Sequence, residues 1–169
     1  MHKLFYVIPG LFLLLSMNTI AEASTMKISS PSFQDHQPIP KKFTCQDQDM
    51  SPELVIEGTP KEAKSLTLIV DDPDAPMGIW VHWVVYDIPP ATQKIAESAV
   101  PGKQGINDFH KINYGGPCPP SGVHRYFFKV YALDTMLNLP EGKSKKDIEQ
   151  AMNGHILVKA EFVGTYKKE

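Results

Sequence analysis

The sequence predicts a mostly β protein, a sandwich of two packed sheets with one or two short helices. Four stretches rich in β-branched and aromatic residues, each ended by turn-forming residues, predict the long strands at 65–70, 79–88, 124–133 and 156–166. Their apolar runs are continuous rather than strictly alternating, which is typical of strands covered on both faces. Two sheets packed against each other would cover them in this way.

Helix signals are few. Ser144 is suited to cap a helix because Asp147 follows three positions later, and the apolar stripe within 148–152 continues the pattern until Gly154 stops it. A weaker pattern over 92–98 predicts a second short helix. We therefore expect little helix in a chain dominated by strands.

The composition is that of one globular domain. The chain has 169 residues, 42% hydrophobic and 21% charged, with a net charge of -2, which gives no electrostatic reason to expect a nucleic acid partner. Its 15 prolines are scattered and exceed the usual share of roughly 5%, which favours a loop-rich fold. The stretch 100–122 is a long loop, and its aromatic residues favour an ordered, functional loop over a disordered one.

The first 23 residues are predicted to be a secretory signal peptide. An apolar run over 4–17 follows a weakly basic start, and small residues flank Glu22 before the expected cleavage after Ala23. A retained membrane anchor is the alternative, but the run is shorter than the ~20 residues that a spanning helix needs. The mature protein would be a single domain, residues 24–169, periplasmic or secreted.

Export affects how the two cysteines, Cys45 and Cys118, are interpreted. An even number of cysteines in an oxidising compartment permits one disulfide. Two buried free thiols that never meet are equally compatible with the sequence. The residues alone leave both interpretations open.

Three polar clusters lie at the ends of predicted strands. In the segment 71–76, prolines hold the aspartates in place, although Asp and Pro are also common in plain surface turns. His82 lies inside a strand, where strict alternation would give it a common face with Trp80 and Val84. A lone strand histidine of this kind is more often a satisfied core residue than a ligand contact.

The third cluster runs from Tyr114 to Tyr126. Its glycines let a bound group approach the backbone, and its prolines keep the loop in one shape, which lowers the cost of ordering it on binding. His124 and Tyr126 are two positions apart at the start of a strand and so share a face. This combination favours a binding loop.

These clusters together resemble the two signature regions of the phosphatidylethanolamine-binding protein (PEBP) family. The matching segments are Asp72-Pro73-Asp74-Ala75-Pro76, Trp80-Val81-His82-Trp83, and Gly115-Gly116-Pro117-Cys118-Pro119-Pro120 followed by His124-Arg125-Tyr126. The segment 48–54 is similar to the family's upstream Ser-Pro segment, and the loops resemble the prokaryotic, Raf-kinase-inhibitor-like branch. The resemblance runs from residue 27 to residue 166.

The resemblance implies a PEBP-like β-sandwich with a small cavity for phosphate-like anions and phospholipid head groups. Carried over one position at a time, it implies the ligand contacts Asp72, His82, Gly116, Cys118, Pro119, Pro120, His124 and Tyr126, with Asp74, Pro76 and Trp80 as further candidates. It also brings Cys45 near Cys118 and so favours a disulfide between them. No catalytic residue, metal or cofactor is implied. Animal relatives close the cavity with a C-terminal helix that does not follow the last predicted strand here.

Three functions compete at this point. The first is a non-enzymatic binding protein that takes a small anion or head group and modulates a partner kinase or protease. The second is a metal-dependent hydrolase that uses the aspartate and histidine cluster, although these histidines lack a paired-ligand spacing. The third is a homodimeric structural protein with a vestigial pocket. The donor-rich pocket without a nucleophile favours the first.

Overall fold

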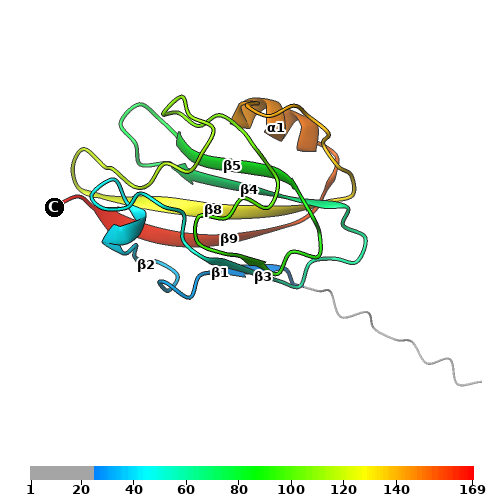
Figure 1. Ribbon diagram of the computed structural model, residues 1–169, viewed down its shortest axis with the longest axis horizontal. Helices are drawn as coiled ribbons and strands as arrows, with labels where there is room; N and C mark the ends of the chain where they lie inside the picture. The colour runs from blue at the N-terminus through cyan, green and yellow to red at the C-terminus, as the bar shows by residue number, and fades with distance from the viewer. Residues whose placement is uncertain (1–24) are drawn as a thin grey trace, which may run out of the picture.

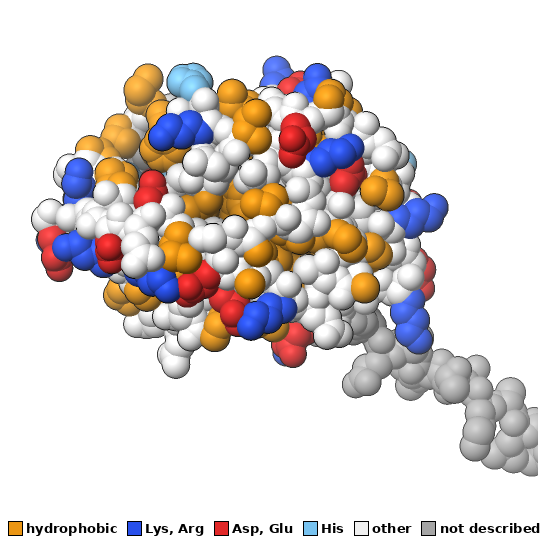
Figure 2. Space-filling view, in the orientation of Figure 1, with side chains coloured by type: hydrophobic (Ala, Val, Ile, Leu, Met, Phe, Trp, Pro, Cys, Tyr) orange, Lys and Arg blue, Asp and Glu red, His pale blue; other side chains and the backbone are white. Residues whose placement is uncertain are grey.

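The computed structural model describes residues 25–169, so the predicted signal peptide, residues 1–23, and its cleavage site lie outside the described residues. None of the helices in the described part of the chain is long and apolar enough to cross a membrane. Lysine, arginine, aspartate and glutamate side chains are intermixed over the face shown in Figure 2, so that face carries no large patch of one sign.

The described chain forms two sheets (Figure 1). The larger has the strand order β2-β9-β8-β4-β5-β7, and the smaller has the order β1-β3-β6. The strands are β1 (Lys27–Ser29), β2 (Gln37–Pro38), β3 (Leu54–Glu57), β4 (Ser65–Asp72), β5 (Trp80–Ile88), β6 (Lys94–Ile95), β7 (Lys103–Gln104), β8 (Val123–Leu133) and β9 (Ile156–Lys167). All pairs are antiparallel except β2 with β9. The prediction of a mostly β, two-sheet sandwich is confirmed.

Every residue of β4 is buried, because both faces of the large sheet are covered at its centre. On one face, Leu66, Leu68 and Val70 belong to the main core that also includes residues of the small sheet. On the other face, Ile69 belongs to a second core with Ile148 of helix α1 (Lys145–Met152). The continuous apolar run of β4 is therefore covered by the small sheet on one face and by helix α1 on the other.

The predicted helix after residue 144 is confirmed. Ser144 caps α1 by accepting a hydrogen bond from the backbone of Asp147, whose carboxylate accepts one from the Ser144 backbone in return. The short helix predicted over 92–98 is wrong. That segment contains β6 instead, because Ile95 pairs with Leu54 and is buried in the main core. A 3-10 helix, η1 (Lys41–Phe43), lies elsewhere in the chain.

A shift in the pairing of β4 with β5 changes the direction of His82. Val70 pairs with Trp83 and Asp71 pairs with Val81, so His82 is an extra residue in β5 without a partner on β4. Such a bulge breaks the two-residue alternation of a strand and redirects a side chain. Val84 lies in the second core beneath α1, so the predicted common face of His82 and Val84 is wrong.

Candidate ligand-binding site

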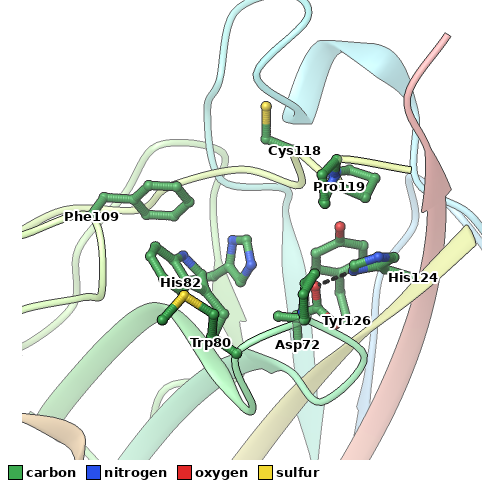
Figure 3. A pocket seen from close by; sticks show the side chains of 12 residues that line it. Asp72, Trp80, His82, Phe109, Cys118, Pro119, His124 and Tyr126 are labelled. Carbon is green, nitrogen blue, oxygen red and sulfur yellow. Dashed lines mark hydrogen bonds and ion pairs between the residues drawn. The ribbon is translucent and has the colours of Figure 1, made fainter. Parts of the chain in front are cut away.

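A cavity of about 330 Å³ lies where β4 ends and where β5 and β8 begin. Figure 3 shows its side chains converging from these strands and from the loops above them. Twelve residues line it: Asp72, Ala75, Pro76, Met77, Trp80, His82, Phe109, Cys118, Pro119, Pro120, His124 and Tyr126. The structure thus brings together Asp72, His82 and His124, which lie in three different strands.

Asp72 and His124 form a buried pair across β4 and β8. The Nδ1 atom of His124 lies 2.7 Å from Oδ2 of Asp72, and both side chains are less than a tenth exposed. Since an ionised carboxylate can only accept hydrogen bonds, Nδ1 carries the proton. The second ring nitrogen of His124 has no hydrogen-bond partner in the described part of the chain, so Asp72 fixes the ring while leaving that nitrogen available.

His82 is also fixed through one ring nitrogen. Its Nδ1 atom donates to the backbone oxygen of Gly115 at 2.6 Å, since a carbonyl oxygen can only accept. Burial lowers the pKa of His82 and outweighs the opposing effects of this bond and of Asp72, so the neutral ring is favoured. The Nε2 atom is buried without a hydrogen-bond partner among the described residues. In the neutral ring it offers a lone pair.

Tyr126 supplies a hydroxyl that is buried without a partner in the same described region. Burial, helped by the charge of Asp72, raises the pKa of Tyr126 far above its usual value, so the hydroxyl stays protonated and can donate. In Figure 3 the hydroxyl points toward the loop that carries Cys118 and Pro119. The ring packs edge-on against His82, with 5.1 Å between ring centroids.

The loop above the cavity is tied to an N-terminal segment. Cys45 and Cys118 form a disulfide, with their Cα atoms 5.5 Å apart. The hydroxyl of buried Tyr114 donates to the backbone oxygen of Phe43 at 2.9 Å. Cys118, Pro119 and the neighbouring proline therefore line the cavity from a loop that is anchored to this segment.

Gly116 lies outside the cavity lining, unlike the position that the family resemblance implied for it. Its backbone N–H donates to Oδ1 of Asp49 at 2.6 Å. A Cβ atom at Gly116 would collide with the Asp49 carboxylate and the Phe43 backbone oxygen. The glycine is therefore needed for close packing of this loop.

The three further candidates divide into two groups. Pro76 and Trp80 line the cavity, whereas Asp74 does not. The carboxylate of Asp74 instead holds Arg125 through two side-chain hydrogen bonds of 2.7 and 2.8 Å, and the bonding to Arg125 lowers the pKa of Asp74. Asp74 thus ties the turn after β4 to β8.

Sequence reasoning missed three lining residues, Ala75, Met77 and Phe109. Ala75 and Met77 lie within or next to a recognised motif, but neither side chain is polar, so chemistry gave no reason to select them. Phe109 lies in the long loop 100–122, whose aromatic content was the available signal. Its ring contacts Trp80 and His82 edge-on, at centroid distances of 5.4 Å each.

The fold and this cavity define a class of protein, a β-sandwich binding protein whose cavity at the strand ends has mostly apolar walls and a few polar groups. The family model for phosphatidylethanolamine-binding protein matches residues 29–167. The chain is 50% identical over 158 residues to a UPF0098 protein of Aquifex aeolicus, covering 88% of this chain and 92% of that protein. It is 48% identical over 151 residues to one of Methanothermobacter thermautotrophicus, covering 85% and 99%.

Solved structures agree with this match. The crystal structure of the PEBP homologue CT736 from Chlamydia trachomatis has a TM-score of 0.84 at 45% identity, covering 86% of this chain and 99% of that one. The structure of E. coli YbcL, described as a member of the mammalian PEBP family, has a TM-score of 0.79 at 29% identity, covering 85% and 99%. The chain belongs to the phosphatidylethanolamine-binding protein family.

Proposed function

We propose that the cavity binds a small phosphate-like anion, free or as a phospholipid head group, without chemically changing it. The observation that carries this proposal is that two of the three buried side-chain polar atoms without partners among the described residues, His82 Nε2 and the Tyr126 hydroxyl, belong to side chains that line the cavity. A buried group left without a hydrogen bond costs about 1–3 kcal/mol. A ligand that satisfies both atoms recovers this cost.

The geometry assigns complementary roles to the three rings. The Tyr126 hydroxyl donates to an anionic oxygen, and His124 lines the same cavity. His82 accepts from a protonated phosphate oxygen, or it takes up a proton because a bound anion raises the pKa of an imidazole. Asp72 keeps His124 in one orientation.

Several features support binding rather than catalysis. Cys118, the cysteine of the lining, is in a disulfide, and the described residues that line the cavity include no serine or threonine. Both oxygens of Asp72 are engaged, one with His124 and one with the backbone N–H of Asp74. Within residues 25–169, no group of three or more His, Cys, Asp or Glu side chains is arranged to hold a metal ion.

We also propose that the protein is exported to the periplasm or secreted. The N-terminal pattern with its expected cleavage after Ala23 supports this, and so does the disulfide, because disulfides persist in oxidising compartments. Mass spectrometry of the protein from a fractionated host would test it; an intact N-terminus in the cytoplasmic fraction would contradict it. Modulation of a partner kinase or protease, and homodimerisation, stay predictions from the sequence.

Calorimetric titration with inorganic phosphate tests the binding proposal. We expect Tyr126→Phe and His124→Ala each to weaken binding about tenfold or more, because a hydrogen bond to a charged group is worth about 1.5–3 kcal/mol. The matched control is Tyr131→Phe, which removes a hydroxyl from the same strand outside the cavity. Equal phosphate affinity in the wild type and both cavity variants would refute the proposal.

A further inference from the structure

We propose that the ligand is a compact acid with one negative charge and one apolar group about the size of an aromatic ring. This inference rests on the proposed function and narrows it. The preferred ligand is then neither a bare phosphate ion nor a lipid whose long chains are held inside the protein. Three observations support it: the charge of the lining, the nature of its walls and the size of the cavity.

The charge of the lining fits one negative charge on the ligand. Among the described residues that line the cavity there is no lysine or arginine, and Asp72 is one of them. A charge on His124 would be balanced by Asp72, 2.7 Å away, and the neighbouring Arg125 is bound to Asp74. The one positive charge that remains for the ligand is the proton that His82 takes up with the anion, so a second negative charge would enter the site without a partner, which is costly.

The polar groups are few, and the remaining walls are apolar. Phe109 stands edge-on to both Trp80 and His82, so an aromatic surface begins beside the polar groups. Met77 is 93% exposed and lines the same cavity. A thioether side chain is flexible and packs well on aromatic rings. Two aromatic side chains and this methionine thus form an apolar wall for the part of the ligand that carries no charge.

A glycine holds the aromatic wall in place. A Cβ atom at Gly115 would lie 2.6 Å from two ring carbons of Phe109, so this ring lies directly against the backbone. The backbone oxygen of the same residue fixes His82. Gly115 therefore sets the spacing between the ring of His82, which contacts the acid group of the ligand, and the ring of Phe109, which contacts its apolar group.

The size of the cavity limits the apolar group. Its volume of about 330 Å³ lies at the low end of the range for small-molecule sites, roughly 300–1,000 Å³. An acid group and one ring fit into such a space, whereas two long acyl chains do not. We therefore infer that a lipid source of the ligand would offer its head group and leave its chains outside.

The test compares small acids that differ in one property at a time. At fixed pH, we expect benzoate to bind about tenfold more tightly than acetate, because burying a ring recovers about 25 cal/mol per Å² of apolar surface. Benzyl alcohol, which has the ring without the charge, should bind least. At pH 7.5, methyl phenyl phosphate, with one charge, should bind about tenfold more tightly than phenyl phosphate, whose second ionisation lies near pH 6.

Variants assign the effect to the apolar wall. We expect Met77→Ala and Phe109→Leu to reduce benzoate affinity about three- to tenfold and to reduce acetate affinity by a smaller factor. Met136→Ala is the matched control, because this methionine is 47% exposed and lies outside the cavity. Met77 is almost fully exposed, so its replacement should leave the fold intact, which circular dichroism would verify.

The outcomes separate this inference from the proposed function. Equal affinity for benzoate and acetate, with both lost in Tyr126→Phe, would overturn the inference and leave anion binding in place. Tighter binding of the doubly charged phenyl phosphate than of its methyl ester would overturn the single-charge requirement. If neither inorganic phosphate nor any of the acids binds, the proposed function itself fails.

Discussion

Two neighbouring aspartates of β4, Asp71 and Asp72, differ in how their charge is satisfied. Asp71 is fully buried, and its two oxygens accept from Lys129 and Lys145 at 2.6 Å each. Lys145 lies in α1, so this cluster ties the helix to the sheet. Asp72 accepts from His124 and lines the cavity. Consecutive strand residues point to opposite faces, which explains the separation.

The difference distinguishes a structural carboxylate from a carboxylate that prepares a binding site. The cluster around Asp71 continues to Glu149, 3.6 Å from Lys145, so its charges are matched within the protein. The chain of contacts from Asp72 ends instead at the second ring nitrogen of His124, which has no hydrogen-bond partner within residues 25–169. Equal burial therefore says little about function. What matters is whether the last polar group in the network has a partner within the protein.

The largest effect that we expect follows from removing the structural carboxylate. Asp71→Asn would leave two mostly buried lysines without their counter-charge, and breaking a buried ion pair costs about 3–5 kcal/mol. Denaturant unfolding should show this loss in the free energy of unfolding. Phosphate affinity at 25 °C should remain that of the wild type, because the cluster lies on the opposite face from the cavity.

A matched control is Glu149→Gln. The carboxylate of Glu149 is about half exposed, so its removal should lower the free energy of unfolding by less than about 1 kcal/mol. If Asp71→Asn abolished phosphate binding while leaving stability unchanged, the roles that we assign to the two aspartates would be reversed.

The sequence predicted the elements whose signals are local. The long strands have uninterrupted β-branched and aromatic runs, and α1 has a capping box at Ser144, so neighbouring residues define both kinds of element. The helix predicted over 92–98 failed because pairing of Ile95 with β3, far along the chain, decides its conformation. Local propensity is a weak guide wherever such a distant partner exists.

The cavity was predictable in its polar residues and not in its geometry. His82 points to the cavity because β5 contains one more residue than β4 at that point, and no pattern within β5 shows this. No local pattern shows that the N–H of Gly116 donates to Asp49, because Asp49 lies in a distant segment. The apolar wall at Phe109 depends on contact with Gly115 across a loop.

A smaller loss of stability is expected when the carboxylate of Asp72 in the cavity is removed. In Asp72→Asn the side-chain amide can hydrogen-bond the ring of His124, but it cannot balance an imidazolium charge or fix the protonated nitrogen. We expect a stability loss of about 1–3 kcal/mol, smaller than that of Asp71→Asn, together with about tenfold weaker phosphate binding. Denaturant unfolding and phosphate titration of Asp72→Asn and Asp71→Asn would measure this difference. If both variants lost stability and phosphate affinity to the same extent, the two aspartates would not have separate roles.

The smallest effect concerns pH and His82. Burial lowers the pKa of His82 below its ordinary value of 6.5, so below pH 6.5 the unfolded chain binds a proton that the folded chain does not. The free energy of unfolding should therefore fall as the pH drops from 7.5 to 5.5. His82→Gln should show a shallower fall, whereas His110→Gln, at an exposed position, should match the wild type.

Phosphate provides a second test of the role of His82, because a bound anion favours the protonated ring. Saturating phosphate should reduce the loss of stability between pH 7.5 and 5.5 in the wild type and have no such effect in His82→Gln. Binding near pH 6.5 should also take up protons, which titration in buffers of different ionisation enthalpy measures. If the wild type and His82→Gln had the same pH dependence with and without phosphate, the unpartnered nitrogen would not be the group that meets the anion.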